Sequence, residues 1–479
     1  MQLLTVRQLE REAPARRRRT AARTLPALLT AAALALTGCS SATAPSSDAH
    51  HPDGTVVRVP QDFPSVQKAV DVAREGDTVL VSPGTYRESV RITKPRIVLR
   101  GTDRNTVVLD GGVRLVNGVT VTGPGSVVEN LTVHGYLANG VLFTGVTDEK
   151  LQQRGAGGSA YNPLDTTRFP ALQGFRATRV TAYDNGLYGI YAFDARAGIV
   201  EDSYASGGAD SGIYVGQCKP CDTLVRGNTV ERNAVGIEIT NASDNLYFLG
   251  NRVVGNRVGV TVNSNDLEAL APQHGAVIAG NSVTDNNASD TPEQADGGFG
   301  IGIGIGGGTA NRVERNLVRG NRSAGVIITD PPGHPAGANR IQGNRTEGNG
   351  ADLVLASADT GNCFSGNQPA TQSPDGLESL AACDAQSRSP LTAGRAAPVQ
   401  APPGIPFNQV QAPPGPPRPP AGAAQPRRSS AGGLTAFTAV TSGASSGLRA
   451  ASSRASRRAA SLVGRACSRS LRPSSLTSV

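Results

Sequence analysis

The chain repeats one short pattern, which reads NTVERNAVGIEI at 228–239, NRVVGNRVGVTV at 251–262, NLVRGNRSAGVII at 316–328 and NRTEGNGADLVL at 344–355. The glycines that open the apolar part of the pattern are Gly189, Gly212, Gly236 and Gly259. They are 23, 24 and 23 residues apart. A nearly fixed period of this size, built from short apolar alternations between Asn/Gly corners, is typical of a β-solenoid. The sequence therefore predicts an all-β solenoid.

The charge of the 479-residue chain is unevenly distributed. The total is +8, but residues 1–38 carry +5, and residues 385–479 hold twelve Arg and no acidic residue. A charge of −9 is left for residues 39–384. The strongly basic character that would attract nucleic acid is therefore confined to the two ends, and the predicted folded part is acidic. We expect no nucleic-acid partner.

The N-terminus has the features of an export signal. A basic run, Arg16–Arg19, precedes an apolar stretch, Leu25–Leu36, that is too short to span a bilayer permanently. The stretch ends in Leu36-Thr37-Gly38-Cys39, which resembles the bacterial lipoprotein lipobox and implies cleavage before Cys39 and lipidation of its sulfur. An ordinary secretory signal is the alternative. The prediction is an exported protein, held by its lipid on the outer face of the cytoplasmic membrane.

Four segments follow from these patterns: a lipoprotein signal peptide (1–38), a flexible tether (39–54), a solenoid domain (55–384) and a tail (385–479). Val66, Ala69, Val70 and Ala73 predict a short amphipathic helix, stopped by Gly76, that caps the open apolar end of the solenoid. The tail is rich in Pro, Ala, Ser and Arg and has no periodicity, which predicts disorder. Our hypothesis is that much of it is read in a shifted frame.

A family resemblance narrows the fold. The run from Phe63 to Ile92, with Gly76-Asp77-Thr78 and Pro83-Gly84-Thr85-Tyr86-Arg87-Glu88, resembles the opening of right-handed parallel β-helix proteins. This superfamily includes pectate lyases, pectin methylesterases and the periplasmic NosD proteins. The resemblance covers about residues 55–368 and implies a right-handed parallel β-helix. More narrowly, YGIYAFDARAG (188–198), DSGIYVGQCKPCD (210–222), VTVNSNDLEALAPQ (260–273) and NCFSGN (362–367) resemble a group of actinobacterial β-helix lipoproteins.

The cysteines beyond Cys39 favour disulfides, because an exported protein matures in an oxidising compartment. Cys363 and Cys383 flank the last repeat, and we predict that they pair. Cys218 and Cys221 form a C-x-x-C motif, for which a local disulfide at a corner is favoured over zinc or redox chemistry.

Outward-facing residues of consecutive repeats should form columns. Strand side chains alternate, so Ile190, Ile213, Ile237 and Val260 are predicted to point inward, and Tyr191, Tyr214, Glu238 and Thr261 to point to solvent one above the next. A second column reads Asp194, Gln217, Asn241 and Ser264. Aromatic faces beside polar groups suit a sugar polymer, so Tyr191, Tyr214, Glu238, Gln217 and Asn241 are predicted to bind carbohydrate. Stacking that only stabilises the sheet is the alternative.

A further column consists of Asn228, Asn251, Asn281, Asn316 and Asn344. Stacked amides at corners satisfy backbone groups and one another, so this column is predicted to be structural, with Asp202 in the same column one repeat earlier.

Catalytic motifs known on this fold are incomplete in this chain. Where a mannuronan epimerase would show Asp-Pro-His, the comparable residues are Asp194-Ala195-Arg196. Elimination from a uronate needs a base and a cation that stabilises the enolate. The catalytic candidates are Asp194, Asp210, Arg196 and Asp184. Scattered His residues and a single Met disfavour copper, whereas Ca²⁺ through carboxylate oxygens is a possible cofactor with no assigned ligands.

The sequence therefore predicts a monomeric, lipid-anchored cell-surface protein whose β-helix binds or organises an extracellular or cell-envelope polysaccharide. One alternative is a polysaccharide lyase or epimerase acting on an acidic sugar polymer. The other is a periplasmic accessory protein similar to NosD.

Overall fold

The computed structural model describes residues 56–152, 164–295, 297–358, 361–385 and 391–415. The chain divides into two compact units, Met1–Ala49 and His50–Val479. The first unit, with the predicted signal peptide and Cys39, lies outside the described residues, as do residues 50–55 at the start of the second unit. All the described helices and strands belong to the second unit.

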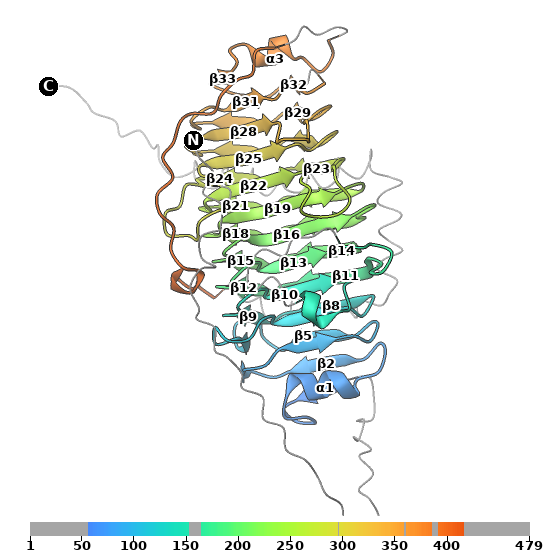
Figure 1. Ribbon diagram of the computed structural model, residues 1–479. Helices are drawn as coiled ribbons and strands as arrows, with labels where there is room; N and C mark the ends of the chain where they lie inside the picture. Colours follow the sequence, from blue (N-terminus) through green and yellow to red (C-terminus); the bar gives the residue numbers. More distant parts are fainter. Residues whose placement is uncertain (1–55, 153–163, 296, 359–360, 386–390, 416–479) are drawn as a thin grey trace, which may run out of the picture. The chain divides into compact units, whose positions relative to one another are not determined.

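Three parallel sheets form the described part of this unit (Figure 1). The first, sheet A, has twelve strands: β1 (Val56–Val59), β2 (Thr78–Val81), β5 (Val98–Gly101), β8 (Ser126–Glu129), β11 (Leu172–Thr178), β14 (Ala195–Glu201), β17 (Thr223–Arg226), β20 (Leu246–Leu249), β23 (Ala276–Ala279), β26 (Arg312–Glu314), β29 (Arg340–Gln342) and β32 (Cys363–Ser365).

Sheet B has ten strands: β3 (Gly84–Tyr86), β6 (Val107–Asp110), β9 (Thr132–His134), β12 (Thr181–Tyr183), β15 (Tyr204–Ser206), β18 (Thr229–Glu231), β21 (Arg252–Val254), β24 (Ser282–Thr284), β27 (Leu317–Arg319) and β30 (Arg345–Glu347). Sheet C has eleven: β4 (Val90–Ile92), β7 (Val119–Val121), β10 (Val141–Thr144), β13 (Ile190–Phe193), β16 (Ser211–Cys218), β19 (Val235–Ala242), β22 (Val258–Asn263), β25 (Ile301–Gly306), β28 (Ala324–Thr329), β31 (Leu353–Ala356) and β33 (Gln372–Ser373).

Each turn of the coil passes from sheet A to sheet B to sheet C, and every strand pairs in parallel with its counterpart one rung away. This is a parallel β-helix, so the predicted fold class is confirmed. The predicted inward positions are also confirmed: Ile190, Ile213, Ile237 and Val260 are in register and form part of the continuous core inside the coil.

The N-terminal end of the coil is covered by helix α1 (Val66–Val72), as predicted. Ser65 caps it by accepting a hydrogen bond from the Lys68 backbone N–H at 3.3 Å. The carboxylate of Glu88 accepts from the N–H groups of Val66 and Gln67, at 2.9 and 2.8 Å. A carboxylate at this position satisfies two unpaired donors of the first turn. The Glu of the Pro-Gly-Thr-Tyr-Arg-Glu run therefore fixes the cap in place.

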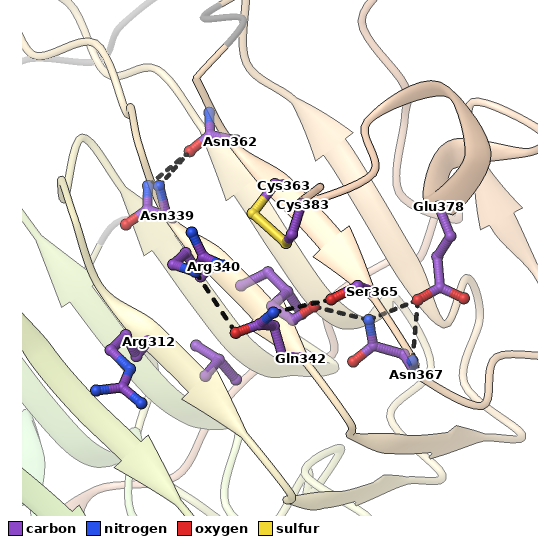
Figure 2. The surroundings of a disulfide bond; sticks show 12 residues. Arg312, Asn339, Arg340, Gln342, Asn362, Cys363, Ser365, Asn367, Glu378 and Cys383 are labelled. Carbon is purple, nitrogen blue, oxygen red and sulfur yellow. Dashed lines mark hydrogen bonds between the residues drawn. A yellow bond between two sulfur atoms is a disulfide. The ribbon is translucent and has the colours of Figure 1, made fainter. Parts of the chain in front are cut away.

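The other end is closed by a short helix and a disulfide (Figure 2). Helix α3 (Leu377–Leu380) buries Leu377, and Cys383 after it is bonded to Cys363 of β32. A second disulfide joins Cys218 and Cys221 at a corner of the coil. The remaining short elements are α2 (Glu149–Gln152), within an insertion, and the 3-10 helix η3 (Phe407–Gln409).

An asparagine ladder runs along the corner between sheets A and B. In each step the Oδ1 of one Asn accepts hydrogen bonds from the backbone N–H and the Nδ2 of the preceding one. The ladder contains the predicted residues and one more, and reads Asn228, Asn251, Asn281, Asn316, Asn344 and Asn367. A second ladder follows the corner between sheets B and C, with Asn233, Asn256, Asn286, Asn321 and Asn349.

The predicted place of Asp202 in the first ladder is wrong. The residue in register is Ser203, whose backbone N–H donates to Asn228 Oδ1 at 2.9 Å. Asp202 is exposed and has a φ of 49°, and its backbone N–H donates to the Arg226 carbonyl, immediately before Gly227 (φ 63°) of the next rung. Asp can adopt this left-handed conformation, which is the geometric requirement at that corner position.

Residues 391–415, which belong to the predicted disordered tail, differ from that prediction. They form an extended segment, here called the strap, along one side of the coil (Figure 1). Its hydrogen bonds to the coil join Gly394 to Leu355 (2.6 Å), Ala397 to Ser323 (3.1 Å), Gly404 to Glu293 (3.0 Å) and Ile405 to Thr291 (2.9 Å). Ala396 packs on an apolar cluster outside the core that includes Ile327 and Val354. Covering these outward-facing apolar side chains gives the strap a defined position despite its composition.

Candidate functional site

The predicted outward column exists on sheet C. Tyr191 of β13 pairs in register with Tyr214 of β16, which pairs with Glu238 of β19 and then Thr261 of β22. All four side chains therefore stand on the outer face, as the alternation requires. The residues inside the coil alternate with them.

The predicted exposure of Tyr214 is wrong. Its side chain points outward, but the residue is only 1% exposed because the insertion between β22 and β23 folds back over it. Glu268 of this insertion accepts a hydrogen bond from the Tyr214 hydroxyl and is itself 6% exposed. Tyr191 and Glu238, on either side of Tyr214, are half-buried.

Four aromatic rings gather at this position. The Tyr191 ring lies 4.2 Å from Tyr188, 4.9 Å from Tyr214 and 5.4 Å from Phe193, measured between ring centroids. Tyr188 and Tyr214 are buried, whereas Tyr191 and Phe193 are half-buried on the outer face of β13. These two rings are the aromatic surface that a ligand can reach.

Three carboxylic acids lie beside the rings. The Tyr188 hydroxyl donates to Asp210 Oδ2 at 3.0 Å, and Asp210 and Glu238 are hydrogen-bonded to each other. Burial, followed by the nearby charge of Asp210, raises the pKa of Glu238 well above its ordinary value. Burial likewise raises the pKa of Glu268 to about 8, an effect that its hydrogen bond with Tyr214 partly offsets. Near neutral pH this cluster therefore holds protonated carboxyl groups, which can donate hydrogen bonds.

The second predicted column lies at the corner between sheets C and A, and it is buried. Asp194, Gln217 and Asn241 have φ values of 53°, 48° and 44°, and their side chains hold the corner and the insertion rather than facing solvent. Gln217 Oε1 accepts from the Ala269 N–H at 3.0 Å, and Asn241 Nδ2 donates to the Glu268 carbonyl at 2.9 Å. The predicted exposure of this column is therefore wrong.

The four catalytic candidates occupy different environments. Burial raises the pKa of Asp194 to about 7, although the Gln217 amide partly opposes the shift. Burial also raises the pKa of Asp184 to about 7, at the corner after β12. Arg196 forms an ion pair with Asp222 at 2.6 Å on sheet A. Among the four, Asp210 is the residue that lies in the aromatic–acidic cluster.

The chemistry of the cluster favours binding over bond cleavage. Paired carboxyl groups of glycosidases stand about 5 Å or more apart, whereas Asp210 and Glu238 are directly hydrogen-bonded. The charged groups that shift the pKa values of Glu238 and Glu268 are themselves acids. Among the described residues, no three His, Cys, Asp or Glu side chains are grouped to hold a metal ion, so the possible Ca²⁺ has no located site.

Sequence reasoning missed Tyr188, Glu268 and Thr240. Thr240 donates to Glu238 Oε1 at 3.1 Å. Tyr188 precedes its strand and Glu268 lies in an insertion, so neither follows the repeat that defined the columns. The departure of residues 263–276 from the period was the available signal, because long insertions on a solenoid usually line its binding face.

The predicted lipidation site, Cys39, and the predicted signal peptide lie outside the described residues. Within the described part of the chain, no helix is long and apolar enough to span a membrane.

The chain is thus a right-handed parallel β-helix protein, and the outer face of its sheet C carries an aromatic–acidic cluster. Residues 117–273 match the family model described as right handed beta helix region. No curated protein sequence matches the chain.

Three of the solved structures that this chain resembles are described here. The A-module of a mannuronan C-5 epimerase from Azotobacter vinelandii is 15% identical, with 65% of this chain and 92% of that chain covered and a TM-score of 0.44. The Dettilon tailspike protein is 14% identical, with 65% and 62% covered and a TM-score of 0.47. A pectate lyase is 16% identical, with 68% and 82% covered and a TM-score of 0.37. With TM-scores below 0.5 and identities of 14–16%, these likenesses say nothing about the function of this chain.

Proposed function

We propose that the chain is an exported, lipid-anchored protein whose β-helix binds an extracellular or cell-envelope polysaccharide on the outer face of sheet C. The observation that carries this proposal is the pair of half-buried rings, Tyr191 and Phe193, next to the half-buried carboxyl groups of Asp210 and Glu238. Pyranose C–H faces pack on aromatic rings, and adjacent polar groups bond to hydroxyls.

The acids favour a neutral glycan. Asp210, Glu238 and Glu268 would repel a polyuronide when ionised, and when protonated they donate hydrogen bonds to sugar hydroxyls. A neutral polymer meets neither charge repulsion nor a need for a counter-ion.

The full chain is tested against neutral and acidic polysaccharides, with and without Ca²⁺, and binding and product masses are followed together. We expect Tyr191→Ala to weaken binding of a neutral glycan by at least about tenfold, because a stacking face is lost. Tyr247→Ala is the matched control, since Tyr247 is a half-buried, outward-facing tyrosine on sheet A.

Unchanged binding in Tyr191→Ala would contradict the site. New unsaturated or epimerised products would instead establish the lyase or epimerase alternative, and their loss in Asp210→Asn would place that activity in the cluster.

The anchor is tested separately. Cells that express Cys39→Ser should release the protein into the medium, and the intact mass of the wild-type protein should include a lipid on Cys39. Retention of the variant at the membrane would contradict lipid anchoring.

A further inference from the structure

One insertion covers the centre of the aromatic column. The segment between β22 and β23, residues 264–275, is here called the cover loop. It interrupts the repeat, and its Glu268 lies over Tyr214, whose side chain the register places outward. Without this loop Tyr191, Tyr214 and Glu238 would form one continuous surface over three rungs.

The cover loop is held at its two sides. On the corner side, Asn241 Nδ2 donates to the carbonyls of Asn265 and Glu268 at 2.8 and 2.9 Å, and Gln217 accepts from Ala269. At the loop's tip, Asp266 contacts His334 Nε2 at 3.0 Å. The tip also exposes Leu267, which is 53% accessible.

In the closed loop, Glu268 is buried with only part of its hydrogen-bonding capacity satisfied. One of its oxygens accepts from Tyr214, but Oε2 is buried and has no hydrogen-bond partner among the described residues. The negative charge of Asp210 raises the pKa of Glu268, and the negative charge of Glu268 raises the pKa of Glu238. A buried, half-satisfied carboxyl group among other acids opposes closure, whereas the hydrogen bonds on the corner side of the loop and at its two ends favour it.

We propose that the cover loop is a gate over a second saccharide subsite, whose floor is Tyr214. In the closed state Glu268 accepts the hydrogen bond of the Tyr214 hydroxyl, and a sugar ring of the bound glycan replaces the loop when it opens. Tyr214 then adds a second ring beside Tyr191, whose ring centroid is 4.9 Å away and whose plane is inclined by 73° to that of Tyr214. The nature of the ligand rests on the proposed function, whereas the movement of the loop does not.

Hydroxyl-radical footprinting of the full chain, read residue by residue by mass spectrometry, tests the gate. We expect Tyr214 to be oxidised at least about threefold faster in Glu268→Ala than in the wild type, because the latch is lost. Leu267→Ala is the control on the same loop and should leave Tyr214 unchanged. Tyr136, fully buried in the core, reports any general unfolding.

A second variant keeps the test decisive if Glu268→Ala unfolds. Glu268→Gln retains an acceptor for Tyr214 and removes the ionisable group, so it should slow Tyr214 oxidation at pH 8 relative to the wild type. Equal Tyr214 oxidation in the wild type and both variants overturns the gate.

Glycan-bound samples separate the two proposals. Protection of Tyr191, with oxidation of Leu267 increased and Tyr214 still protected, is the expected result. Protection of Tyr191 without a change at Leu267 overturns the gate and leaves the binding site intact. Protection of neither tyrosine by any glycan of the panel contradicts the proposed function, while the oxidation rates of the Glu268 variants still decide whether the loop opens.

Discussion

The corner between sheets A and B repeats the same residue at successive rungs, whereas the outer face of sheet C carries a different residue at each rung. At the corner the same amide recurs at every rung from Asn228 to Asn367, and each one satisfies the next. On the outer face successive rungs carry Tyr191, Tyr214 and Glu238, and an insertion decides which of them meets solvent. The repeated amides therefore stabilise the coil, and the positions that break the repeat form the aromatic–acidic cluster.

The largest effect should come from breaking the corner. Asn281→Ala removes the acceptor of the Asn251 N–H and Nδ2 groups and the donor to the Phe248 carbonyl, all of them buried. We expect a loss of about 5 kcal/mol in the free energy of unfolding, since each unsatisfied buried group costs ~1–3 kcal/mol. Urea unfolding measures it.

Thr261→Ala on the outer face is the comparison for this variant. The Thr261 hydroxyl has no hydrogen-bond partner among the described residues, so its removal should cost less than about 0.5 kcal/mol. Similar losses in the two variants would contradict the distinction between corner and face.

The next largest effect is expected at the corner between sheets C and A, where one residue of the column is an acid instead of an amide. Gln217 and Asn241 are neutral amides, but Asp194 in the same column is a buried acid with a pKa raised to about 7. An acid whose folded pKa is raised favours the folded state at low pH, and that stability is lost as pH rises from its ordinary value to about 7. Asp194→Asn should therefore gain about 4 kcal/mol at pH 8 and little at pH 4.

Unfolding of both proteins at the two pH values checks this difference. A gain of the same size at pH 4 would show that packing, and not ionisation, distinguishes the two side chains. Asp184, with the same raised pKa, should leave part of the pH dependence in the variant.

A smaller effect is expected at the end of the ladder. Asn367 donates from its backbone N–H and its Nδ2 to Glu378 Oε1, at 2.9 and 2.8 Å (Figure 2). Glu378→Ala should cost about 2 kcal/mol, because two donors lose their acceptor. Hydrogen exchange should rise in β32 and not in β17. Glu378→Gln keeps one acceptor oxygen and should cost less than half as much.

The smallest effect is expected on the face itself. Tyr191→Ala removes a half-buried ring and its stacking contacts, which should cost about 1 kcal/mol of stability. Thermal unfolding measures it. A loss as large as that of Asn281→Ala would mean that the ring is part of the structural framework, as the stacking alternative holds.

The regular parts of the molecule could be predicted from the sequence. Inward residues such as Ile213 and Ile237 and the ladder residues follow a fixed offset within each repeat, so one correctly aligned repeat places all the others. The offset failed by one residue at Asp202, because the left-handed position beside the ladder accepts both Asp and Gly.

The candidate site could be predicted only in part. Alternation gives the direction of the Tyr214 side chain but does not show what lies above it, since Glu268 reaches it from an insertion without a period. The strap is similar: its composition resembles that of disordered segments, and its position depends on outward apolar side chains such as Ile327 on a distant strand. Contacts of this kind are tertiary and leave no local pattern.

The ladders also have a direction. The backbone N–H and one Nδ2 hydrogen of each ladder Asn are donated toward the C-terminal end of the coil, while the other Nδ2 hydrogen is donated to a carbonyl of the preceding rung. Each of these two ladders finishes on a carboxylate, Glu378 in one and Asp352 in the other. Asp352 accepts further hydrogen bonds from the N–H groups of Ala370 and Thr371. A carboxylate only accepts, so the series of donated hydrogens stops there. Among the described residues, neither of these two ladders offers a side-chain amide hydrogen at this end, so a second coil placed there could not extend them.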